Sequence, residues 1–402
     1  MAHRGCSGAT QTLGLDFPAA TFLRANPLSL KHMKVDRGIL LAVFFLIGLG
    51  LVQVYSSSYI FATEGYNDGL FFFRKQVVFA LMALCSIFLV SNIPWPWAYK
   101  LGWILWGVAV IGIIGTLIPG IGLKVGGAYR WIQMPFGFRF EPGELLRVTY
   151  PFVLSALVAG YAANKVDRNW WSKFVGVLAP LGLLYMQPDF GSFVLIGSLT
   201  FCLFLAFGLR WRYIIGAVTV AVPVLAFMII SSPYRRLRVE AFINPWADPA
   251  EKGFQVIQSL LSFYSGGVTG VGLGQGQGKL FFLPEAHTDF TLAVLGEEMG
   301  FVGFFILLMV YGYLVFRGFQ ITLALKRFRE RSMALYFSLL LAFSVFINAG
   351  VTMGLLPTKG LTLPLLSYGG SSLLCTALCI GWLLNLERES EVALSFRDRQ
   401  ID

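Results

Sequence analysis

Residues 38–56 read GILLAVFFLIGLGLVQVYS and contain no charged side chain. About 20 apolar residues in a row are enough for one helix to cross the hydrocarbon core of a bilayer. Similar runs recur at 76–93, 100–119, 147–164, 172–187, 190–208, 211–231, 290–316, 333–355 and 366–386. The ten runs predict an all-α, polytopic integral membrane protein with about ten transmembrane helices.

The composition of the 402 residues supports this fold class, because 56% are hydrophobic and only 13% are charged. The apolar runs are continuous, whereas the strands of a membrane β-barrel alternate apolar and polar residues. The five cysteines are scattered and predict neither a disulfide framework nor a paired-cysteine metal site. The net charge of +10 forms no basic stripe, so we expect no nucleic-acid partner.

Basic residues predict the orientation of the chain. Residues 326–331 carry four cations in one short connection, and such connections lie in the cytoplasm. Ten spans then place both ends in the cytoplasm. The expected parts are a cytoplasmic N-terminal tail at 1–37, a ten-helix membrane domain at 38–386 and a cytoplasmic C-terminal tail at 387–402.

Two longer connections, 120–146 and 232–289, are expected on the external side. The second is the large external loop. Within it, residues 254–264 place Phe254, Ile257, Leu261 and Tyr264 on one helical face. This face fits either the membrane interface or burial against the bundle, and the sequence leaves both open.

A polar segment, PEAHTDF at 284–290, precedes one of the apolar runs. Thr288 or Asp289 could cap the helix, with Glu285 near the positive end of its dipole. A cap needs only one such residue, whereas this segment has four polar side chains once His287 is included. The segment therefore also indicates chemistry at a membrane edge, of the kind that an enzyme acting on lipid-linked substrates needs.

Four other regions carry polar residues near the membrane boundary. Residues 266–279 are rich in glycine and end in Lys279, but they fit no nucleotide-binding motif, so we predict a flexible or tightly turned loop. Asp189 lies between two apolar runs and is a functional candidate. Glu144 and Arg147 are spaced i, i+3 at a helix start, which favours a structural salt bridge. Residues 356–372 predict an irregular loop that lines a cavity.

Six strings together resemble the SEDS family of bacterial peptidoglycan polymerases, in order and in spacing. The resemblance covers residues 37–390, and it is stronger to the cell-division branch of the family than to the elongation branch. One departure is Glu141-Pro142-Gly143-Glu144 followed by Arg147, where the family usually has Gln-Pro-Ser-Glu and lysine. The strings are GAYRWI (127–132), QPDFG (187–191), RRLRVEAFINPWADP (235–249), LPEAHTDF (283–290), GEEMG (296–300) and LPTKGLTLPLLSYGGSS (356–372).

The resemblance implies glycosyl transfer, with lipid II as the acceptor and a polyprenyl-diphosphate-linked glycan as the donor. Asp289 matches the family's catalytic aspartate and is expected to act as the general base, with Glu285 as a competing partner in acid–base catalysis. Cations are needed for the leaving diphosphate, and Arg235 is one of them. The expected substrate-binding side chains are Arg130, Asp189, Arg236, Arg238, Glu285, His287, Thr288, Lys359, Ser367 and Ser371.

No cofactor is certain from the sequence, and a divalent cation, Mg or Mn, stays open as a helper of the leaving group. The resemblance implies partnership with a class B penicillin-binding protein, a transpeptidase, and with other division proteins. It also implies the bacterial inner membrane, at the division septum, with the site facing outward. A lipid II flippase, a division scaffold and an elongation-type polymerase are the alternatives.

Overall fold

The computed structural model describes residues 36–398 apart from 126–127, 135–138, 164–168 and 281–282. Contacts divide the chain into residues 1–35 and 36–402. The first unit holds nearly all of the expected N-terminal tail and lies outside the described residues.

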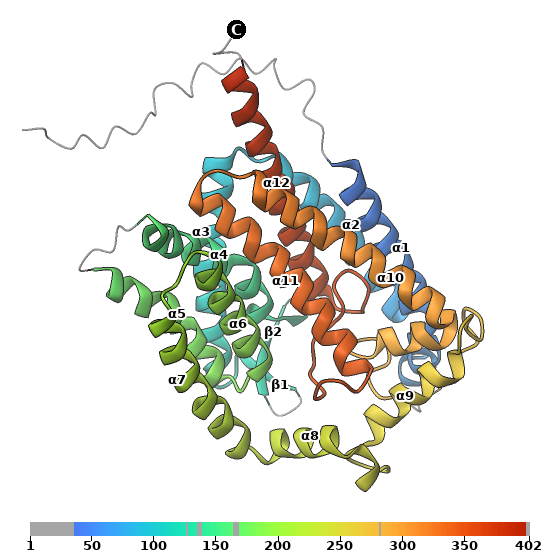
Figure 1. Ribbon diagram of the computed structural model, residues 1–402. Helices are drawn as coiled ribbons and strands as arrows, with labels where there is room; N and C mark the ends of the chain where they lie inside the picture. Colours follow the sequence, from blue (N-terminus) through green and yellow to red (C-terminus); the bar gives the residue numbers. More distant parts are fainter. Residues whose placement is uncertain (1–35, 126–127, 135–138, 164–168, 281–282, 399–402) are drawn as a thin grey trace, which may run out of the picture. The chain divides into compact units, whose positions relative to one another are not determined.

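Each of the ten apolar runs forms a helix, which confirms the all-α membrane fold (Figure 1). Eight of the ten are long and apolar enough to cross a bilayer, and α5 and α6 are apolar but 17 residues long. At 1.5 Å per residue, 17 residues span roughly 25 Å, slightly less than the hydrocarbon core. The helices are α1 (Arg37–Tyr66), α2 (Phe71–Asn92), α3 (Trp95–Leu117), α4 (Pro142–Ala162), α5 (Trp170–Met186), α6 (Phe190–Ala206), α7 (Trp211–Ile230), α10 (Thr291–Ala324), α11 (Phe328–Thr352) and α12 (Gly370–Asp398).

The core is built around α4, which is buried on most of its faces. The Phe152 ring of α4 packs edge-on against Trp382 of α12, with ring centroids 4.7 Å apart. On the other side of α4, helix α3 approaches closely at Gly102. A Cβ atom at this position would lie only 2.2 Å from the Phe152 ring, so the glycine permits the contact. Small residues let helices approach in this way where lipid supplies no hydrophobic drive for their association.

The two longer connections, 120–146 and 232–289, contain strands and helices. The first contains three short strands, β1 (Gly122–Val125), β2 (Ala128–Gln133) and β3 (Arg139–Phe140), which form an antiparallel sheet in the order β1-β2-β3. The large loop contains α8 (Pro233–Ile243), a 3₁₀ turn η4 (Pro245–Ala247) and α9 (Phe254–Gly266). Figure 1 shows the sheet, α8 and α9 at one end of the bundle and the carboxyl end of α12 at the other.

Helix α9 has one buried and one exposed face. Ile257 is buried, and Ser259 Oγ donates a 2.6 Å hydrogen bond to the carbonyl of Thr352 in α11. Leu261 and Tyr264 are 47% and 85% exposed. The apolar face expected at 254–264 is therefore split, and only part of it is buried against the bundle.

The glycine-rich run 266–279 is held by two glutamates of α10. Lys279 Nζ lies 2.7 Å from Glu298 Oε1, and both side chains are almost fully buried. The same ammonium donates to Ser56 Oγ at 2.8 Å and to the Gly274 carbonyl at 2.7 Å. Glu297 accepts hydrogen bonds from the backbone N–H of Gln277 and Gly278. The lysine after the glycines thus anchors the loop to α10.

Helix α12 continues to Asp398, which is beyond the end of the apolar run at residue 386. Residues 387–398 of the expected C-terminal tail are therefore helical. Residues 399–402 lie outside the described residues.

Candidate active site

Asp289 ends a tight turn that leads into α10. The N-cap of α10 is Phe290, and no side chain caps this helix. The turn is instead closed by the carbonyl of Glu285, which accepts from the N–H groups of Thr288, Asp289 and Phe290 at 3.1–3.2 Å. The interpretation of Thr288 or Asp289 as an N-cap is therefore wrong, and the Asp289 carboxylate is not needed to start the helix.

Glu285 does not share a helical face with Asp289. Its backbone has φ of +56°, a left-handed conformation that breaks any helix at this position. Its side chain is exposed and accepts a 2.8 Å hydrogen bond from Thr288 Oγ1. The continuous helix that an i, i+4 pair of carboxylates requires is absent at 284–290.

The Asp289 carboxylate lies against the loop at 356–369. A Cβ atom on Gly360 would be 3.3 Å from Asp289 Oδ2, so glycine leaves space beside the carboxylate. Asn348 Nδ2 donates to the carbonyls of Asp289 and of Leu361, at 3.0 and 2.7 Å, and ties the two segments together. Among the described residues, no hydrogen bond reaches the carboxylate itself.

The surroundings of Asp289 make its carboxylate a stronger base. Burial, and then the negative charge of Glu285, raise its pKa to about 7, while Arg238 and Arg130 act in the opposite direction. A carboxyl group with a pKa near neutrality is about half ionised at physiological pH. It can therefore accept a proton and release it again.

Cations from α8 and from the loop itself lie near this segment. Arg238 of α8 donates from Nη1 to the carbonyl of Thr358 at 2.8 Å. The Nζ atom of Lys359 lies 5.6 Å from the centre of the Phe190 ring, and Arg235 lies 5.3 Å from the same ring. Burial, and then the charge of Arg147, lower the pKa of Lys359 to about 8.

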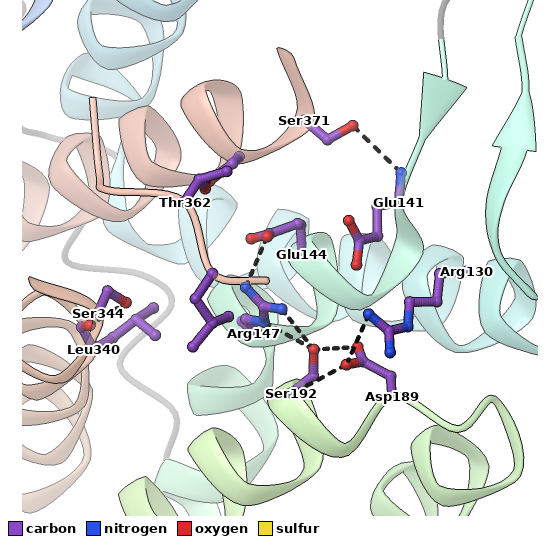
Figure 2. Close-up of polar contacts among 12 residues, drawn as sticks. Arg130, Glu141, Glu144, Arg147, Asp189, Ser192, Leu340, Ser344, Thr362 and Ser371 are labelled. Carbon is purple, nitrogen blue, oxygen red and sulfur yellow. Dashed lines mark hydrogen bonds and ion pairs between the residues drawn. The ribbon is translucent and has the colours of Figure 1, made fainter. Parts of the chain in front are cut away.

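A chain of buried polar contacts extends from these cations into the bundle (Figure 2). Arg130 of β2 lies 3.9 Å from Asp189, and Asp189 accepts from Ser192 Oγ. Ser192 in turn accepts from Arg147 Nε at 3.0 Å, and Arg147 Nη1 lies 2.7 Å from Glu144 Oε1. The i, i+3 pair expected at 144 and 147 is thus one end of a larger network. Buried charges require such partners, because an unpaired charge is costly away from water.

Metal coordination has no evident protein site. Among the described residues, no group of three or more histidine, cysteine, aspartate or glutamate side chains is arranged to hold a metal ion. The carboxylates of the network are instead paired with arginines. The described residues thus hold no preformed cluster of three such ligands for a divalent cation.

The family described as "Cell cycle protein", named for FtsW, RodA and SpoVE, matches residues 37–392. The chain belongs to this family. This confirms the resemblance that the six strings carry.

Relatives and solved structures of the family resemble this chain over most of its length. A probable peptidoglycan glycosyltransferase FtsW of Geobacter metallireducens is 39% identical over 363 residues, covering 89% of this chain and 96% of the relative. One of Geobacter sulfurreducens is 40% identical over 357 residues, covering 88% and 95%.

Solved structures, including the following two, share the fold. One is a chain from a study of how a peptidoglycan synthase complex coordinates polymerization and crosslinking. It has a TM-score of 0.72 and 30% identity, covering 89% of this chain and 99% of that chain. The rod shape determining protein RodA of Thermus thermophilus has a TM-score of 0.65 and 27% identity, covering 89% and 98%.

Two of the expected substrate-binding residues, His287 and Ser367, contact other parts of the protein. The His287 ring packs in an aromatic cluster with Phe61, Phe72 and Tyr368, and burial lowers its pKa. The Ser367 hydroxyl is buried and accepts from the backbone N–H of Leu363.

Two other expected residues lie at the edges of the site. Ser371 Oγ accepts from the N–H of Glu141 (Figure 2). It donates to the carbonyl of Arg139. Arg236 is exposed, and its side chain has no hydrogen bond or ion pair among the described residues.

Two residues of the site were missed by the sequence analysis. Glu141 is buried, and its pKa is raised to about 8, first by burial and then by the charges of Glu144 and Asp189, so it is mostly protonated at neutral pH. Asn348 positions Asp289 from within α11. A buried amide in the apolar run 333–355 was a usable signal for Asn348, because polar residues within spans are rarely neutral in function.

Proposed function

We propose that this chain is a peptidoglycan glycosyltransferase that polymerises lipid II into glycan strands for the septal cell wall, with Asp289 as the general base. The observation that carries the proposal is the Asp289 carboxylate, with a pKa near 7 and no structural hydrogen bond among the described residues. It lies beside Gly360, within the electrostatic reach of Arg238 and Arg130. The names of the FtsW relatives support the same chemistry.

The proposed step transfers one glycan chain onto a new sugar. Asp289 removes the proton from a hydroxyl of the lipid II acceptor, and that oxygen forms a bond with the anomeric carbon of the donor glycan. The bond between that carbon and the diphosphate oxygen breaks, and its electron pair leaves with the polyprenyl diphosphate. In this proposal, Arg130, Arg238 and Lys359 stabilise the negative charge on the departing diphosphate.

The pH dependence of polymerisation should show two limbs. Below pH 7 Asp289 becomes protonated, so the rate should fall by up to about tenfold per pH unit. Above pH 8 Lys359 loses its charge, and the rate should fall again. Arginine stays protonated throughout, so Lys359→Arg should remove the alkaline limb and keep the acid limb. An unchanged alkaline limb in initial rates of the Lys359→Arg protein would exclude Lys359 as its source.

We also propose a class B penicillin-binding protein as the partner of this chain. A related chain comes from work on a synthase complex that combines polymerization with crosslinking, which supports such pairing. Purified protein incubated with labelled lipid II should form polymer, and the amount should rise several-fold when the transpeptidase is added. Movement of lipid II across vesicle membranes without polymer would instead indicate a flippase. If neither polymer nor movement is observed, a scaffold role would be indicated.

The proposed location is the bacterial inner membrane at the septum, with the 232–289 loop and the active site outside. The cations of residues 326–331 support this orientation. A reporter fused after Arg331 should be cytoplasmic, and one inserted at an exposed position of the 232–289 loop should be external. The reverse result would place Asp289 on the wrong side of the membrane for wall synthesis.

A further inference from the structure

A large apolar groove lies between α4, α5, α6 and α7, away from the candidate active site. Its volume is about 770 Å³, and aromatic rings dominate its wall, including Tyr161, Trp170, Phe174 and Phe204. The Trp170 and Phe174 rings stack with their centroids 5.3 Å apart. Figure 1 shows α5, α6 and α7 together on one side of the bundle.

Glycine residues and a loosely packed helix create the space in this groove. A Cβ atom built on Gly197 of α6 or on Gly216 of α7 would meet no atom within 4 Å. Helix α7 buries only Ile214 and Met228, so most of its surface is left uncovered by the described protein. The groove is therefore a feature of helix spacing and is not filled by side chains.

One end of the groove is cationic. Arg210 and Arg212 line it, and both are exposed at the start of α7, where the helix dipole also favours an anion. Trp211 between them is 75% exposed, as expected for a residue that anchors a helix at the level of lipid head groups. Arg212 contacts Tyr213, and within the described residues neither arginine forms an ion pair with a carboxylate.

We infer that this groove binds a phospholipid with an anionic head group, with the phosphate on Arg210 and Arg212 and the acyl chains along the aromatic wall. Basic pockets between transmembrane helices on the cytoplasmic side bind acidic lipids in this way. The short connection that carries Arg210 and Arg212 is cytoplasmic by the positive-inside rule.

The chemistry of the groove favours a lipid over a protein helix. The paired arginines match a phosphate better than they match an apolar helix. Flexible acyl chains can also follow an irregular, open groove.

The lipid site is separate from the proposed chemistry. Asp189 of the polar network caps the amino end of α6, whereas Arg210 follows its carboxyl end. The 17 residues of α6 put roughly 25 Å between these ends. Lipid binding can therefore be measured without any assay of polymerisation, and its failure would leave the proposed function untouched.

The test is native mass spectrometry of the purified full chain in detergent, with added phosphatidylglycerol or with phosphatidylcholine of the same acyl chains. The wild-type protein should bind phosphatidylglycerol more tightly. The double variant Arg210→Gln/Arg212→Gln should weaken that binding by roughly 30-fold. This follows because each cation near a membrane surface contributes about fivefold to the affinity, and two are removed. Gly216→Phe should fill the groove and reduce the binding of both lipids.

The control is Lys326→Ala/Arg329→Ala, which removes two exposed cations and should leave lipid binding unchanged. Lys326 lies in the connection between α10 and α11, and Arg329 lies in the first turn of α11. Thermal unfolding verifies that each variant is folded. Equal affinity of the wild-type protein for the two lipids would overturn the inference. Full binding of phosphatidylglycerol by the folded glutamine variant would also overturn it. So would a cysteine at position 216 that cross-links to a single-span protein in place of a lipid.

Discussion

Replacing Asp289 with asparagine should reduce glycan polymerisation by roughly 10²–10⁴-fold, the range typical for loss of acid–base help. Asparagine keeps the shape of the side chain and cannot accept the proton of a sugar hydroxyl. The backbone carbonyl of residue 289 can still accept its hydrogen bond from Asn348. The measurement is the initial rate of polymer formation from labelled lipid II, with the transpeptidase partner present.

The same substitution should not weaken the fold. In the folded chain the pKa of Asp289 is raised from 3.8 to about 7, so its ionisation opposes folding as the pH rises between those values. Asparagine removes that penalty, and the thermal midpoint at pH 8 should be equal or higher. If unfolding caused the loss of activity, the thermal midpoint of the variant would instead be lower than that of the wild-type protein.

Glu285→Gln is the matched control, because it neutralises the carboxylate nearest in sequence. Glu285 is exposed and lies on a left-handed turn, outside the contacts with Gly360 and Asn348. Its loss should lower the rate by no more than a few-fold. A larger loss with Glu285→Gln than with Asp289→Asn would reverse the assignment of the base.

The second large effect concerns stability. Glu298→Gln should leave the buried ammonium of Lys279 without its charged partner, and breaking a buried pair in this way costs about 3–5 kcal/mol. The contact of Lys279 with α10 should be lost, while the hydrogen bonds from Gln277 and Gly278 to Glu297 still hold the glycine-rich loop. A strongly lowered thermal midpoint of the protein in detergent is the expected result.

Two further variants show whether the charge itself is responsible. Lys279→Met/Glu298→Leu removes both charges, and it should recover much of the stability that the single variant loses. Lys252 and Glu240 form an exposed pair elsewhere in the 232–289 connection, 3.4 Å apart, so Lys252→Met should change the midpoint very little. Equal effects of Glu298→Gln and Lys252→Met would contradict the proposed role of the buried pair.

The helices of this protein could be predicted because hydrophobic run length depends on the bilayer and not on tertiary contacts. Every apolar run became a helix, including the pair joined only by Gln187, Pro188 and Asp189. The sheet at 122–140 could not be predicted in the same way. Its strands have two to six residues, too few for a period to be recognised, and their pairing is set by the sheet.

The candidate site was located from sequence, but its contacts were not. Asp289 and Lys359 stood out as polar residues at membrane boundaries and as parts of family strings. Their environment depends on residues far away in sequence, such as Asn348 on Asp289 and Arg147 near Lys359. Capping was a reasonable expectation for Asp289, but the helix begins one residue later, after a local turn that is closed by the Glu285 carbonyl.

The most direct test of the central claim is the full kinetics of Asp289→Asn with lipid II, separated into kcat and KM. A general base acts only in the transition state, so kcat should fall by roughly 10²–10⁴-fold while KM stays within a few-fold of the wild-type value. A raised KM with an unchanged kcat would show that Asp289 only binds substrate, and it would contradict its role as the base.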